Sequence, residues 1–103
     1  MYARRLTLHL KPNATAEFSK TIENQIIPML RKQKGFQDEL VFMGNNAAEV
    51  FAISLWDRRE NAEAYGRTSF PEIQKNLAKV VEGIPQVNTY EVLVSTLASK
   101  PVA

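Results

Sequence analysis

The sequence contains no cysteine and only one histidine, His9, among its 103 residues. The absence of cysteine excludes disulfides, thiol nucleophiles and thiolate metal ligands. One histidine cannot form a metal site built from several imidazoles within one chain, so we expect no metal cofactor. Any chemistry here must come from carboxylates, hydroxyls, cationic side chains and aromatic rings, together with that single imidazole.

The chain is also poor in glycine, proline and net charge. It has 4 Gly and 5 Pro, and its 13 basic and 11 acidic residues leave a net charge of +2. This composition predicts one folded domain over residues 1–103. The small net charge gives no indication of a polyanionic partner. No apolar run approaches the roughly 20 residues that cross a bilayer, and no secretion signal is evident, so we expect a cytoplasmic protein without a membrane partner.

The first half of the sequence has the periodicities of a strand followed by a helix. Residues 4–11 alternate leucines with polar residues, which is typical of a half-buried strand. Apolar residues spaced by three and four predict a helix over residues 15–34. Pro28 lies inside that helix, so we expect a kink there, and Gly35 should end it.

The second half predicts a hairpin, a second helix and a last strand. Residues 36–43 and 49–56 are strand-like and are joined by a short Gly/Asn turn. A helix should follow, with Asp57 as its cap, a break at Tyr65–Gly66, a restart at Ser69 and an end near residue 81. Residues 87–96 are rich in β-forming side chains and predict the final strand.

The predicted order is therefore β-α-β-β-α-β. Two right-handed crossovers joined by a hairpin give an α+β fold, the ferredoxin-like plait, with four antiparallel strands and both helices on one face of the sheet. The opposite face has no helix to cover it. His9 and other polar residues of the first strand should lie there, but the third and fourth strands place apolar residues on that face whichever way they are oriented.

An exposed apolar face of several hundred Å² is unusual for a monomer. Pairing with a second copy about a twofold axis would bury it, so we expect a homodimer. RNA binding is the alternative use of such a face, because the RNA-recognition motif has this strand order. Lys34-Gly35-Phe36 begins like that motif, but residues 37–39 then depart from it. We therefore expect no nucleic-acid partner.

Three segments resemble the antibiotic-biosynthesis-monooxygenase (ABM) family: PMLRKQKGF from Pro28, SLWD from Ser54 with the AEAY that follows, and GIPQVNTYEV from Gly83. The resemblance implies a dimeric α+β barrel in which two plaits join their open sheet faces. It also implies a cofactor-free monooxygenase that acts on a small aromatic, quinol-type substrate. In the haem-degrading branch, the characteristic Asn, Trp and His fall on Arg4, Tyr65 and Lys75 here, so no imidazole stands at the position that ligates haem iron in that branch. A haem-handling protein without the usual ligand is a third hypothesis.

Four residues are candidates for such a reaction, in which a substrate is deprotonated in an apolar cavity and its carbanion reduces oxygen. His9, which titrates near neutral pH, and Tyr65 are the candidate catalytic residues. Arg4 could hold an anionic substrate and Trp56 could line its pocket. Each also has a purely structural interpretation: an interface residue for His9, an aromatic plug for Trp56, packing across the helix joint for Tyr65 and exposure to solvent for Arg4.

The alternative function is a non-catalytic dimer that binds a small molecule or has a structural role. The two hypotheses predict different interiors. An enclosed cavity of ~300 Å³ or more beside Tyr65 and Arg4 would favour ligand chemistry. A space filled by Phe18, Phe51 and Leu77 would favour the structural role.

Overall fold

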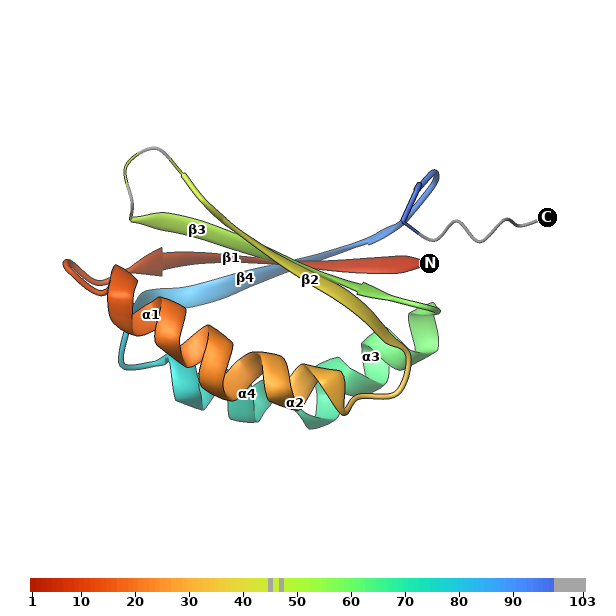
Figure 1. The fold of residues 1–103 in the computed structure, drawn as a ribbon, viewed down its shortest axis with the longest axis horizontal. Helices are drawn as coiled ribbons and strands as arrows, with labels where there is room; N and C mark the ends of the chain where they lie inside the picture. Colours follow the sequence, from red (N-terminus) through yellow and green to blue (C-terminus); the bar gives the residue numbers. More distant parts are fainter. Residues whose placement is uncertain (45, 47, 98–103) are drawn as a thin grey trace.

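The structure is a computed structural model that describes residues 1–44, 46 and 48–97. It confirms the predicted plait, with a four-stranded antiparallel sheet in the order β2-β3-β1-β4 and the helices along one face (Figure 1). The strands are β1 (Tyr2–Leu10), β2 (Phe36–Met43), β3 (Glu49–Trp56) and β4 (Val81–Glu91). The helical segments are α1 (Thr15–Thr21), η1 (Ile22–Ile26), α2 (Ile27–Arg31), α3 (Arg59–Thr68) and α4 (Phe70–Leu77). The predicted hairpin of residues 36–43 and 49–56 is confirmed at both ends.

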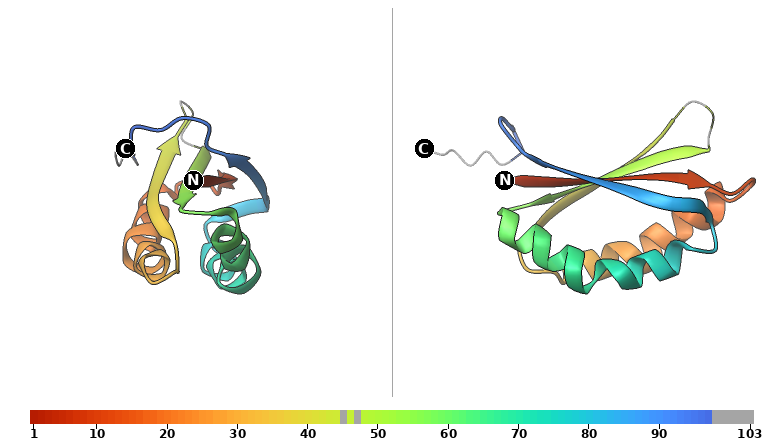
Figure 2. Two further views of the ribbon diagram at one scale, coloured as in Figure 1. Left: turned by 90° about the vertical axis from the view of Figure 1, so that its right-hand side faces the viewer. Right: turned by 180° about the vertical axis from the view of Figure 1, so that it is seen from behind.

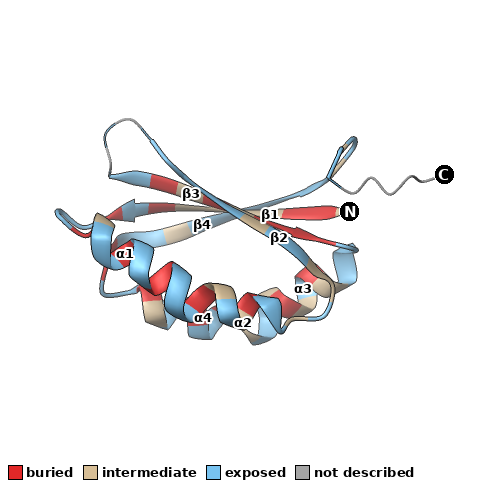
Figure 3. Ribbon diagram, in the orientation of Figure 1, coloured by how far each residue is buried: buried red, intermediate tan, exposed pale blue. Residues whose placement is uncertain are grey.

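The core lies between the sheet and two helical arms, which run side by side beneath it (Figure 2). One arm is α1, η1 and α2, and the other is α3 and α4. The sides of the helices that face the sheet are buried, whereas their outer sides are exposed (Figure 3). Alternate residues of the central strands, among them Leu8, Val50 and Trp56, complete this core.

The first helical arm contains a π-helical segment, η1, immediately before the turn that holds Pro28. Ile27 donates its backbone N–H to the carbonyl of Ile22, five residues back. The buried residues Phe18, Ile22, Ile26 and Leu30 are spaced by four, and in a regular α-helix each such step overshoots a full turn by about 40°. The wider π turn offsets that drift and keeps these side chains on one face. Pro28 then falls in the first turn of α2, where its missing N–H removes no hydrogen bond.

The second helical arm breaks at Ser69, not at the predicted Tyr65–Gly66. Asp57 does not cap α3 as predicted, because the residue at the N-cap is Arg58 and no side chain caps either α3 or α4. Asp57 instead accepts a hydrogen bond from Nδ2 of Asn61 (2.8 Å), and Oγ of Ser69 donates to Oε1 of Gln33 (3.1 Å). Ser69 thus connects the break to the end of the other arm.

The prediction for the last strand was too late by about six residues, since β4 spans Val81–Glu91 and α4 ends at Leu77. The helix does not reach the predicted end near residue 81, and Gly83, just beyond it, adopts φ +75° within β4, where the pairing with β1 shifts register. Such a bulge accommodates glycine, and an edge strand tolerates Pro85 because one row of its N–H groups is unpaired. The apolar residues before Gly83 therefore begin a strand rather than complete a helical face.

The predicted uncovered face is also confirmed. Strand register places Leu40, Phe42, Phe51 and Tyr90 on the side of the sheet away from the helices. Leu40, Phe42 and Tyr90 are 41%, 40% and 49% exposed, respectively. The rings of Phe42 and Phe51 stack with their centres 4.7 Å apart. The surface formed by these four residues is called the open face below.

Candidate functional site

A row of polar residues crosses all four strands on the face toward the helices. Glu39 of β2 pairs with Ser54 of β3, Ser54 pairs with Arg4 of β1, and Arg4 pairs with Thr89 of β4. Alternate residues of a strand share a face, so this row lies on the same side as the core residue Val50. Three of its members, Glu39, Ser54 and Arg4, line a cavity in the otherwise apolar core.

Arg4 is held among aromatic rings rather than by a carboxylate. Its guanidinium carbon lies 4.6 Å from the centre of the Phe70 ring and 5.1 Å from that of Tyr65, which is the geometry of cation–π contacts. Within the described residues, the ion pairs are Arg59–Glu63 and Lys79–Glu17, so no acidic oxygen lies within 4.0 Å of Arg4. Burial lowers the pKa of Arg4, because the charged form has lost water. A buried guanidinium without a carboxylate partner can bind an anionic ligand.

Helix α3 brings its backbone close to this guanidinium. A Cβ atom placed on Gly66 would lie 3.3 Å from Nη2 of Arg4. Gly66 therefore leaves room for Arg4 and does not break the helix.

Tyr65 presents its ring to the cavity and to Trp56. Tyr65 is 6% exposed, and its ring centre lies 4.9 Å from that of Trp56. Burial raises the pKa of Tyr65, so its hydroxyl stays neutral and can donate a hydrogen bond. Trp56 is fully buried, donates Nε1–H to Oγ of Ser54 (2.8 Å) and does not line the cavity. It packs behind Tyr65, in the position of an aromatic plug.

Glu39 is the titratable residue of this site that sequence inspection missed. Burial raises its pKa to about 8; the charge of Asp38 adds to this shift and that of Arg4 opposes it. One signal was present in the sequence: in the strand FQDELVFM, Glu39 alternates in phase with Val41 and Met43. A carboxyl group on the same side of a strand as apolar residues is a candidate for burial. The register of β2 shifts between Phe36 and Asp38, so the sequence alone does not tell which side of this strand faces the helices.

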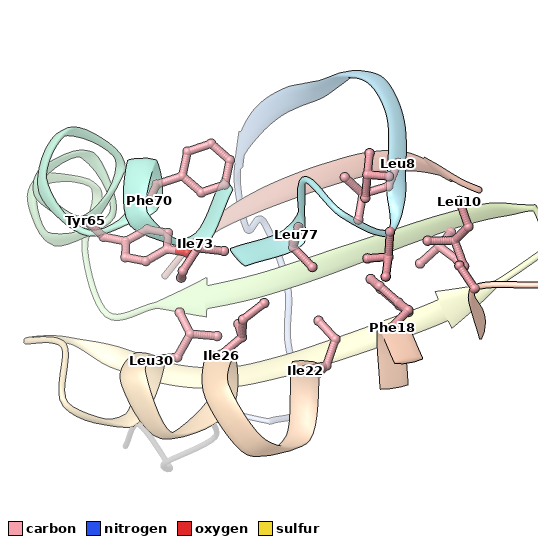
Figure 4. Packing of buried hydrophobic residues seen from close by; sticks show 14 of the residues in the cluster. Leu8, Leu10, Phe18, Ile22, Ile26, Leu30, Tyr65, Phe70, Ile73 and Leu77 are labelled. Carbon is pink, nitrogen blue, oxygen red and sulfur yellow. The ribbon is translucent and has the colours of Figure 1, made fainter. Parts of the chain in front are cut away.

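The cavity has a volume of about 30 Å³, far below the ~300 Å³ that would favour ligand chemistry outright. It can hold roughly one water molecule. Its apolar walls come from both helical arms, whose side chains, including Phe18, Leu77 and Ile73, point toward one another (Figure 4). Phe51, expected to help fill this space, lies on the open face instead.

A groove of about 330 Å³ adjoins this cavity, between β2 and the arm formed by α1 and η1. Phe18, Ile22 and Glu39 line both hollows and so form the wall between them. The rest of the groove is mainly apolar, with Glu23 as its second carboxyl group. The cavity and the groove together provide the volume that the cavity alone lacks.

The structure separates His9 from the other candidates. His9 is exposed on the side of the sheet away from the helices, as its phase in the strand predicted, beside Glu49 of β3 and Glu82 of β4. It lines a surface hollow with Thr7 and Gln86 and does not line the cavity. Arg4 and Tyr65 are thus brought together, Trp56 lies behind them, and His9 lies across the sheet.

Across residues 1–44, 46 and 48–97, no cluster of three or more His, Asp or Glu side chains is arranged to hold a metal ion. In the same residues, every helix is too short or too polar to cross a bilayer.

Comparison with solved structures shows the same fold in proteins of very different sequence. NE2512, a protein of unknown function from Nitrosomonas europaea, superposes with a TM-score of 0.79 at 14% identity, covering 95% of this chain and 94% of its own. A monooxygenase from the gene ActVA-Orf6 of Streptomyces coelicolor, in complex with Nanaomycin D, gives 0.78 at 14% identity, with 95% and 92% covered. SnoaB from Streptomyces nogalater, a cofactor-independent oxygenase, gives 0.73 at 14% identity, with 91% and 94% covered.

Sequence comparison adds nothing to this, because no protein-family model and no curated protein matches the chain. A putative antibiotic biosynthesis monooxygenase from Bordetella bronchiseptica also superposes, with a TM-score of 0.76 at 16% identity over 90% of this chain and 97% of its own. The protein therefore has the ferredoxin-like α+β fold of structures named as antibiotic biosynthesis monooxygenases.

Proposed function

We propose that this protein is a cofactor-independent monooxygenase that acts on a small aromatic, quinol-type substrate. The observation that carries the proposal is the group of Arg4, Tyr65 and Glu39 around a cavity in an otherwise apolar core. The fold supports it, since proteins named as oxygenases have the same fold, one of them described as cofactor-independent. We include in the proposal a homodimer that joins two open faces.

The proposed reaction needs no external reductant. In an anthrone, the keto tautomer of a hydroxylated aromatic, a ring-activated methylene group loses a proton, and the resulting carbanion passes one electron to molecular oxygen. The radical pair combines to form a carbon–oxygen bond, and the peroxide, once protonated, loses water. In sum, one methylene group and one oxygen molecule give one ketone and one water, and the carbon supplies all four electrons. Arg4 would stabilise the carbanion, Tyr65 would donate a hydrogen bond to its oxygen substituent, and the apolar walls would exclude water.

The substrate must reach this site through the groove. An aromatic ring does not fit in about 30 Å³, whereas the groove of about 330 Å³ lies on the other side of Phe18 and Ile22. A ring that displaced these two side chains would span both hollows and bring its polar end to Arg4. Binding should therefore depend on the size of residue 18, and Phe18→Ala should enlarge the route.

Oxygen uptake with a panel of quinols and anthrones tests the proposal. We expect Arg4→Met to lose about 100-fold in kcat/KM, since removing one stabilising group for a developing anion typically costs that much. Tyr65→Phe should lose roughly tenfold, and Arg59→Met, a change of an exposed arginine on α3, should lose little. His9→Ala is measured alongside; a loss as large as that of Arg4→Met would move the reaction to the other side of the sheet. No uptake with any substrate contradicts the proposal.

The second candidate is a non-catalytic homodimer that binds a small molecule or is purely structural. The small cavity favours it, because about 30 Å³ leaves no room for an aromatic ligand unless side chains move. The two candidates differ in their response to ligands. Quinols and anthrones that raise the Tm without consuming oxygen would identify a binding protein, and compounds that do neither would identify a structural one.

A further inference from the structure

Glu39 borders three hollows: the cavity, the groove and a third hollow beside α2. Inside the cavity it faces Arg4 across Ser54, in three consecutive positions of the polar row. Neighbouring strands are about 4.8 Å apart, so the backbones of Glu39 and Arg4 are separated by roughly 10 Å. They do not form an ion pair. The site therefore has an acidic side chain, Glu39, and a basic side chain, Arg4, with the hydroxyl group of Ser54 on the strand between them.

We propose that Glu39 is the proton acceptor of this site, and that the ligand is a hydroxylated aromatic whose anion lies over Ser54 between Glu39 and Arg4. The inference rests on the proposed function, and it assigns a substrate class and a catalytic residue to the same site. An acidic C–H or O–H group fits there because one neighbour takes its proton and the other stabilises the anion that remains. A ligand without an acidic hydrogen would use neither.

The surroundings of Glu39 suit a base. The pKa of Glu39 is raised to about 8, which makes its carboxylate a stronger base than the carboxylate of an exposed glutamate. This pKa is also close to neutral pH, which suits a general base. The charged and titratable groups around it come from β1, α3, η1, α2 and its own strand: Arg4, Tyr65, Glu23, Arg31 and Asp38. Of these, Asp38 favours the protonated form and Arg4 the ionised form.

The same position connects Glu39 to water. Glu39 lines the cavity on one side and the groove on the other, so its carboxyl can equilibrate with solvent between turnovers, while the proton taken from the substrate stays on Glu39 until it is returned to the peroxide. Tyr65 lines the cavity but not the groove, so it lacks this connection to water, and burial keeps its hydroxyl protonated. His9 lies on the opposite face of the sheet.

Proton and electron counts balance with Glu39 as the acceptor. The carboxylate takes one proton from the methylene group, and the carbanion and molecular oxygen combine to form a peroxide anion on that carbon. Glu39 returns its proton to give the hydroperoxide. Loss of the second C–H proton, with hydroxide as the leaving group, gives the ketone and water, and the carboxylate is restored.

The first experiment measures kcat/KM against pH for substrates found by oxygen uptake. In the wild type, activity should rise with pH to a plateau with a midpoint near 8, as Glu39 ionises. Glu39→Gln should lose at least about 100-fold, together with this pH dependence. Asp38→Asn should move the midpoint to lower pH, and Glu72→Gln, which removes an exposed carboxyl of α4, should change neither. A Glu39→Gln variant that keeps the pH dependence overturns the inference.

The second experiment separates this inference from the proposed function, because it needs no turnover. The probe is 1,8-dihydroxyanthraquinone, which has acidic hydroxyls but no oxidisable methylene group and absorbs at longer wavelength once ionised. We expect wild-type protein above pH 8 to bind it in the ionised form, and Glu39→Gln to bind the neutral form at least tenfold more weakly. Ionised binding without oxygen uptake would leave the proton-accepting site standing and the oxygenase refuted. Neutral binding by the wild type, equal ionisation in Glu39→Gln, or no binding at all overturns the inference.

Discussion

Glu39 differs from the other ten acidic residues of the chain in its surroundings, not in its local sequence. Asp38 precedes it and points to the opposite side of the sheet, while Glu39 points under the helices. Residue types in the first strand were easier to interpret, because leucines at every second position identify the face of Arg4 directly. The contact of Arg4 with Tyr65 joins residues 61 positions apart in the chain, and local patterns carry no information about such a pair.

Because its pKa is raised, Glu39 should make stability depend on pH. In the unfolded chain its carboxyl ionises near pH 4.5, whereas in the folded protein it stays protonated until about pH 8. Its contribution is therefore fully present below pH 4.5 and is lost as pH rises to about 8, by an amount on the order of a few kcal/mol. Urea unfolding at pH 5 and pH 8 should show a larger fall in the free energy of unfolding for wild type than for Glu39→Gln. Equal falls in the two proteins would show that Glu39 titrates normally.

Gly66 and Gly35 should respond oppositely to alanine. At Gly66 a Cβ meets the flexible end of Arg4, and alanine favours a helix interior by about 1 kcal/mol, so Gly66→Ala should unfold at the same or a higher Tm. Its displaced guanidinium should weaken binding of the anthraquinone probe. At Gly35, φ is +82° and a Cβ would collide with Asp57 and Asn61, so Gly35→Ala should destabilise by at least about 1 kcal/mol. A lower Tm for Gly66→Ala would mean that its neighbourhood is rigid.

At the scale of elements, the sequence predicts the number, order and kind of the strands and helical arms correctly. It fails where two signals compete. Gly83 and the apolar pair before it look like a helix end, yet a bulged edge strand uses the same residues, and only pairing with β1 decides between them. Pro28 suggests a kink, but the spacing of the buried residues in that arm requires a wider turn, which already accommodates the proline.

The π turn should therefore tolerate substitution but not deletion. Gln25 is exposed, so Gln25→Ala should change the free energy of unfolding by no more than about 0.5 kcal/mol. Deleting Gln25 would return η1 to the α-helical repeat, in which the remaining seven-residue step from Phe18 to Ile26 turns through about 700° and leaves Ile26 and Leu30 on nearly the same face. The deletion would also place Pro28 inside a regular α-helix, where its ring clashes with the carbonyl four residues back, so it should destabilise by about 3 kcal/mol. A deletion variant as stable as Gln25→Ala would refute this account of η1.

At the scale of the whole molecule, the order of strands and helices was the easiest feature to predict, and this order leaves one apolar face of the sheet uncovered. A β-α-β-β-α-β order puts both helical arms on one face, and the alternation within the strands then predicts an apolar open face without any knowledge of side-chain positions. The cavity was not predictable to the same degree. Its volume depends on how closely Phe18, Ile22 and Leu77 approach across the two arms, which sequence periodicity does not specify.

The proposed dimer follows from the open face, and neighbouring residues of one strand can test it. Phe42 stacks on Phe51 on that face, while Val41 pairs with Ala52 of β3 and so has the opposite phase, toward the helices. If two open faces join, Phe42→Glu places an unpaired charge in an apolar interface and should weaken association at least about 100-fold. Val41→Glu adds the same charge one residue away and should leave association intact. Sedimentation equilibrium at micromolar concentration should then give a dimer for the wild type and Val41→Glu and a folded monomer for Phe42→Glu. A wild-type monomer would mean that the open face tolerates water, and the homodimer would be refuted together with any site that depends on it.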